Sequence, residues 1–86
     1  MAEISDLDKA VDILSHVTAM AKLAKKIDQV KTKEERNSIH REMLTIAKTM
    51  AADLKTLGFE SESKDVENLA NELEATIKGY DEAKQE

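Results

Sequence analysis

From Ala2 to Leu57 the chain contains neither proline nor glycine, the two residues that most often end a helix. Proline is absent from all 86 residues, and the two glycines stand at positions 58 and 79. Alanine, leucine, lysine and glutamate, which favour helices, are abundant. The sequence therefore predicts an all-α protein, and its length predicts one small domain.

The first third of the chain has the period of an amphipathic helix, and we predict this helix over about residues 5–30. Ser5 followed by Asp8 favours a capped start, and lysines near the end complement the helix dipole. The apolar residues recur in steps of three and four: Leu7, Ala10, Val11, Leu14, Val17, Met20, Ala21, Ala24 and Ile27.

A second helix is predicted over about residues 33–57, which would form a long antiparallel hairpin with the first. Thr32 with Glu35 three residues later is typical of a helix start. Gly58 stands where a left-handed residue usually closes a helix. The lack of any earlier glycine or proline also allows one continuous helix of about fifty residues, which would need a partner along its length.

A third amphipathic helix is predicted over about residues 62–80, with Ser61 or Ser63 as its cap. The polar residues 81–86 are expected to fray at the end of the chain. The predicted fold class is a small all-α bundle of three helices. We expect it to be dimeric, because so short a chain can bury only a small core and a dimer interface would bury more apolar surface.

The segment ILSHVTAMAKLA, residues 13–24, carries a single charge although 36% of the chain is charged. On a helical wheel its apolar arc covers about half of the circumference, against roughly 100° for an ordinary amphipathic helix. One interpretation makes this helix the centre of the bundle, in contact with both others. The other interpretation turns part of the arc towards a second copy of the chain or another protein.

We therefore predict a non-enzymatic protein–protein interaction module, such as an adaptor, an inhibitor or an accessory subunit, that forms a homodimer through the first helix. The predicted contact residues, with Lys26 and Arg36 as a charged rim, are Ile13, Val17, Met20, Leu23, Ile27, Lys26 and Arg36. The alternative uses the acidic third helix, which would imitate nucleic acid and inhibit a nucleic-acid-binding protein.

No motif in the chain predicts a catalytic, cofactor-binding or metal-binding site. His16 and His40 belong to different predicted helices, several turns apart across the hairpin, and no cysteine is present. Ser15 and His16 are adjacent, so on a helix they point about 100° apart and cannot act as a nucleophile and its base.

Direct binding to nucleic acid is not expected, because the basic residues between 22 and 41 lack stacking aromatics and are interrupted by acids. No apolar run is long enough to span a membrane, so no membrane association is expected. The start MAEISDLDKA lacks the basic and apolar regions of a secretory signal, so we expect a cytoplasmic protein.

Overall fold

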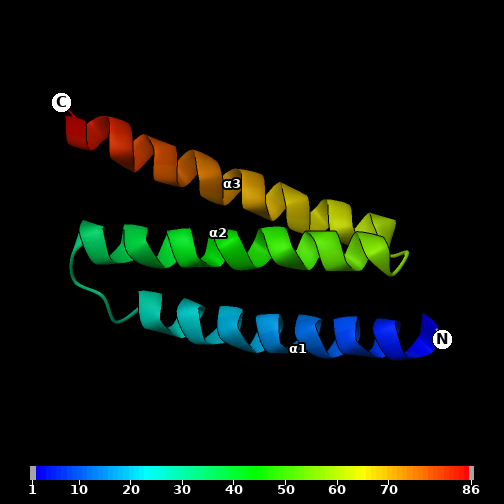
Figure 1. Cartoon of the computed structure of the whole chain (residues 1–86). Helices are drawn as coiled ribbons and strands as arrows, with labels where there is room; N and C mark the ends of the chain where they lie inside the picture. Colours follow the sequence, from blue (N-terminus) through cyan, green and yellow to red (C-terminus); the bar gives the residue numbers. More distant parts are fainter. Residues whose placement is uncertain (1, 86) are drawn as a thin grey trace.

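The computed structural model describes the backbone of residues 2–85 and the side chains of residues 7–83. This part of the chain forms three helices and no strand: α1 (Ala2–Ile27), α2 (Lys33–Thr56) and α3 (Glu60–Gln85). Successive helices run antiparallel, and α2 lies between α1 and α3 (Figure 1). The predicted all-α bundle with a long helical hairpin is confirmed.

The central element of the bundle is α2. The helices pack as two pairs, α1 with α2 and α2 with α3, while α1 and α3 lie on opposite sides of α2 (Figure 1). The interpretation that makes the first helix the centre is therefore wrong. Ala47 and Ala51 of α2 are buried, and such small side chains let α3 approach closely on one side while α1 packs on the other.

The connection between α1 and α2 excludes the single continuous helix. The helical conformation ends at Ile27 and resumes at Lys33, where Thr32 is extended and its hydroxyl accepts a 3.1 Å hydrogen bond from the Glu35 amide. Thr32 therefore caps α2 as predicted. Since α1 begins at Ala2, Ser5 lies inside its first turns and does not precede them, and the Ser5 side chain lies outside the described residues.

The turn between α2 and α3 is closed by Gly58, whose φ of 92° lies in the left-handed region, as predicted. The Phe59 amide donates to the Leu54 carbonyl at 2.9 Å, and the Gly58 amide donates to the Lys55 carbonyl at 3.1 Å. These two bonds define a Schellman motif, which satisfies carbonyl groups that the end of a helix leaves unpaired.

The third helix begins at Glu60, earlier than the sequence predicts, and neither Ser61 nor Ser63 caps it. The Schellman motif makes the turn so tight that the Ser63 amide already bonds the Phe59 carbonyl at 2.8 Å. The helix also continues beyond the expected end at residue 80 as far as Gln85. An ion pair between Asp81 and Arg41 of α2, at 2.6 Å, ties this last part of α3 to the bundle.

The buried core lies mainly between α2 and α3. Among the described side chains, the buried apolar ones are Ile39, Ala47, Ala51, Ala70, Leu73 and Ile77. From α1, Met20 packs against the cluster of Ala47, Ala70 and Leu73, but it is only partly buried itself. No side chain between Leu7 and Ile27 is fully buried. The first helix is therefore the least anchored of the three.

Candidate protein-binding surface

A row of large apolar side chains lies exposed along α1. Leu7, Val11, Leu14 and Val17 are 65%, 54%, 67% and 48% exposed, and we call these four residues the outer row. The exposed neighbours Ala10, Thr18 and Ala21 extend the same side of the helix with small side chains. Single exposed apolar residues are common on proteins, whereas a contiguous row of them marks a contact surface.

The opposite side of α1 faces the bundle. Ile13, His16, Met20, Leu23 and Ile27 are all partly buried, and we call them the inner row. At about 100° per residue, the inner and outer rows lie roughly 150° apart on the helix. The broad apolar arc predicted for this helix thus consists of one side packed on α2 and another side that no described helix covers.

The predicted contact residues divide between these two sides. Ile13, Met20, Leu23 and Ile27 belong to the inner row, and Val17 belongs to the outer row. The two residues of the predicted charged rim lie on different helices, because Lys26 is in the last turn of α1 and Arg36 is in α2. The structure therefore does not bring the seven predicted residues together on one surface.

Leu7, Val11 and Leu14 are the surface residues that sequence reasoning missed. Their periodicity was visible, but a helical repeat alone does not say which of two apolar sides the neighbouring helix covers. Once α2 is placed against Met20, the residues half a turn away must face solvent.

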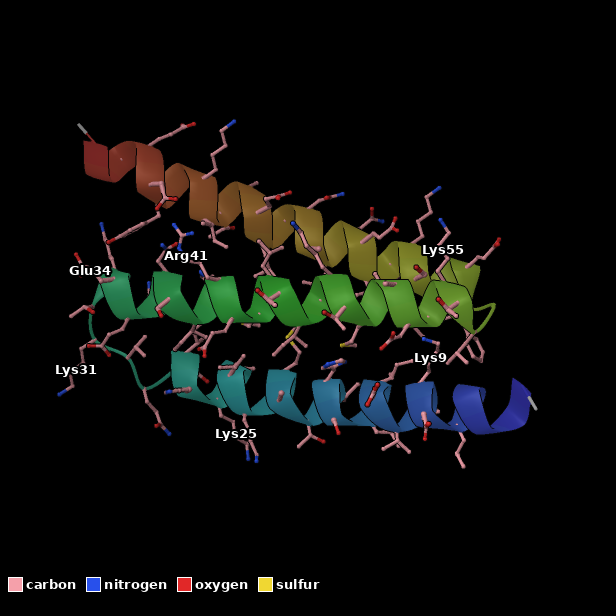
Figure 2. All side chains as sticks on the ribbon, viewed as in Figure 1. Lys9, Lys25, Lys31, Glu34, Arg41 and Lys55 are labelled. Carbon is pink, nitrogen blue, oxygen red and sulfur yellow. The ribbon has the colours of Figure 1, made fainter. Side chains whose placement is uncertain are left out.

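Charge is distributed unevenly along α1. Asp8 and Asp12 are exposed in its first half, and Lys22, Lys25 and Lys26 are exposed in its second half. Figure 2 shows Lys25 on the side of α1 away from α2, whereas Lys9 points towards α2. A shallow hollow that includes Val11, Leu14, Thr18 and Lys22 lies on the outer side between the two charged ends. The outer row is therefore flanked by negative charge at one end and positive charge at the other.

A second hollow lies between the first turns of α2 and the last turns of α3. Its lining residues are Lys33, Arg36, Asn37, His40, Thr76 and Tyr80. Asn37 is buried and its Oδ1 atom has no hydrogen-bond partner, but this oxygen is sealed from solvent. A bound molecule would not reach it in this conformation, so the hollow does not present an assembled polar site.

Tyr80 stands at the edge of this second hollow, close to Glu34 of α2. Burial, and then the negative charge of Glu34 and hydrogen bonding to it, raise the pKa of the Tyr80 hydroxyl above its ordinary value. Because the pKa is raised, the hydroxyl stays protonated to a higher pH than that of a free tyrosine.

The acidic side chains of α3 are partly used within the bundle. Glu74 pairs with Lys48 of α2 at 3.4 Å, and Asp81 pairs with Arg41 at 2.6 Å. Other acids of this helix, including Glu62, Glu67 and Glu72, are exposed. The negative charge that α3 offers to a partner is therefore smaller than the sequence suggests.

The two histidines lie apart, as His16 belongs to the inner row of α1 and His40 to the second hollow. The His16 Nδ1 atom is buried without a hydrogen-bond partner. Among the described side chains, no three histidines or acids gather closely enough to hold a metal ion. Within the same part of the chain, no helix combines the length and apolar character needed to cross a membrane.

Comparisons with protein-family models, curated proteins and solved structures find no match to this chain.

Proposed function

We propose that this chain is a non-enzymatic protein–protein interaction module that binds its partner through the outer row of α1. The observation that carries this proposal is the exposure of Leu7, Val11, Leu14 and Val17 on one side of one helix. Fully burying an exposed aliphatic side chain contributes roughly 1.5–3 kcal/mol, so a partner that covered the part of each side chain that is still exposed would gain about half of that for each residue.

The weak anchoring of α1 supports the same proposal. None of its described side chains is fully buried, whereas α2 and α3 both contribute buried residues to the core. A helix that is apolar on two sides, with only one side packed, is typical of a subunit that completes its packing in a complex. An adaptor, an inhibitor or an accessory subunit would each use such a surface.

Site-specific photo-crosslinking in the cells that produce the protein tests this proposal. A photoreactive amino acid replaces Leu14 in the outer row, and the matched control replaces Asn68, which is exposed on α3. We expect covalent protein adducts from position 14 and few from position 68. The absence of adducts from position 14 would contradict the proposal.

The alternative proposal places binding on α3, whose exposed acids would imitate the phosphates of a nucleic acid. Exposed Glu62, Glu67 and Glu72 support it, while the pairing of Glu74 and Asp81 with α2 counts against it. The crosslinking experiment separates the two, because a mimic would give adducts with a basic protein from position 68. Reversal of charge at Glu67 and Glu72 should then abolish those adducts.

A further inference from the structure

We propose that the outer row of α1 binds a second copy of this chain, with the two α1 helices side by side and antiparallel. This inference rests on the proposed function and names its partner. The pair would be related by a twofold axis at the level of residue 16, on the side of α1 that faces away from α2. A second copy approaching from that side meets neither α2 nor α3, because both lie on the opposite side of α1 (Figure 1).

The distribution of charge on α1 determines the antiparallel orientation. Asp8 and Lys22 lie seven residues before and seven residues after Ser15, so all three share one flank of the outer row. In an antiparallel pair with its axis at residue 16, each Asp8 lies on the same flank as Lys22 of the second copy and is offset from it by two residues, or about 3 Å, so the contact forms twice. In a parallel pair the flank that carries Asp8 and Lys22 would instead face the other flank of the second copy, so Asp8 and Lys22 would not meet.

The sizes of the side chains fit the same arrangement. Leu7, Val11, Leu14, Thr18 and Ala21 follow one another at alternating steps of four and three, which is the spacing of a coiled-coil seam. About the proposed axis, Leu14 faces Thr18 of the second copy and Val11 faces its Ala21. Large side chains thus pack against small ones at these positions, while Leu7 faces Lys25 of the second copy, whose aliphatic stem covers it at each end of the interface.

The proposed interface is one helix wide, so its area lies near the lower end for specific complexes, about 1,000–1,200 Å² in total. We therefore expect a dimer that dissociates at low protein concentration. Asp8 and Lys22 are both exposed, so substitutions at these two positions should leave the fold of each subunit intact.

A charge swap measured by analytical ultracentrifugation over a wide concentration range tests the pairing. Asp8→Lys and Lys22→Asp should each weaken dimerisation about tenfold, because each places like charges together twice. The double variant should return to within about threefold of the unmodified chain. Within one helix these positions are about 21 Å apart, so the rescue can arise only between copies.

The orientation has its own test, because the chain contains no cysteine. Differently tagged Asp8→Cys and Lys22→Cys variants are mixed and oxidised. An antiparallel pair brings the two cysteines together and gives the crossed disulfide, whereas a parallel pair holds positions 8 and 22 far apart and gives none. A dimer that gives no crossed disulfide, or a double charge variant as weak as the single ones, would overturn the proposed pairing.

The apolar contact is tested by Leu14→Glu, with Leu69→Glu as the matched control. Among the described side chains of α3, Leu69 is the large apolar one that is exposed, so its substitution adds the same charge outside the proposed interface. We expect Leu14→Glu to be monomeric with an unchanged helical circular dichroism spectrum, and Leu69→Glu to dimerise like the unmodified chain. Loss of the dimer in Leu69→Glu alone would overturn the inference and place the interface on α3.

The outcomes separate this inference from the proposed function. An unmodified chain that is monomeric at every concentration, yet forms adducts with another protein from position 14, would overturn the second copy as partner and leave the proposed function in place. A monomer that forms no adduct at all would overturn both. Adducts of twice the 9.6 kDa chain mass would support both.

Discussion

The hydroxyl group of Ser63 in α3 donates a 2.7 Å hydrogen bond to the carbonyl oxygen of Ala51 in α2. Both residues are buried, so the bond joins the end of one helix to the beginning of the next without competition from water. Together with the glycine-closed turn beside it, this bond fixes the angle at which α3 leaves α2.

Removal of this bond should destabilise the bundle. Ser63→Ala should lower the free energy of unfolding by about 0.5–1.5 kcal/mol, the usual net contribution of one hydrogen bond. Ser61→Ala is the control, since Ser61 is exposed in the same turn of the helix, and it should change stability by less than about 0.5 kcal/mol. Urea unfolding followed by circular dichroism measures both, and equal effects would contradict the role assigned to Ser63.

The two glycines should respond to alanine in opposite directions. Gly58 has a positive φ, so Gly58→Ala should destabilise the protein by about 1–2 kcal/mol through backbone strain. Gly79 lies inside α3, so Gly79→Ala should stabilise it by about 0.5–1 kcal/mol. A methyl group at either position meets no atom within 4 Å, so thermal or urea unfolding reports the backbone alone.

The inner and outer rows of α1 should differ in their contribution to folding. Met20→Ala should lower the free energy of unfolding by about 1–3 kcal/mol, because Met20 packs against the core cluster. Leu14→Ala should change it by less than about 0.5 kcal/mol, because Leu14 is exposed. Urea unfolding at a concentration where the chain is monomeric makes the comparison, and a larger effect at Leu14 would show that α1 is rotated.

Stability should decline at high pH through the ionisation of Tyr80. Its pKa is raised in the folded state, so folding favours the protonated hydroxyl; this contribution is complete below the ordinary pKa of about 10 and is lost as the pH rises through the folded value. Tyr80 is the only tyrosine and no tryptophan is present, so tyrosinate absorbance follows it directly. Glu34→Gln should lower the pKa, whereas the exposed Glu42→Gln should leave it unchanged.

Local signals in the sequence predicted the helix boundaries that depend on a few neighbouring residues. The hydroxyl of Thr32 and the left-handed conformation of Gly58 act within a single turn, so their positions alone indicated where α2 begins and ends. The start of α3 was predicted too late because a serine hydroxyl can bond to either of two kinds of backbone group. A serine near a helix start often caps that helix, but the hydroxyl of Ser63 donates to the Ala51 carbonyl of α2.

The arrangement of the helices depends on non-local packing and was harder to predict. The wide apolar arc of residues 13–24 suggested a central helix, but Ala47 and Ala51 decide the centre by allowing α3 close to α2. The candidate surface was also only partly predictable. The sequence showed that the apolar arc of α1 is wider than one helix contact needs, but it did not show that Met20 faces the core and Leu14 faces solvent.

Because no side chain between Leu7 and Ile27 is fully buried, the opening of α1 is separable from the unfolding of the other two helices. Backbone amides of α1 should exchange with deuterium by local detachment, while those around Ala47 and Leu73 should require global unfolding. Under the proposed pairing, a second copy binds the outer row only when α1 is folded as a helix, so protection of these amides should rise with protein concentration. The abundance of the chain would then regulate how much of α1 is folded.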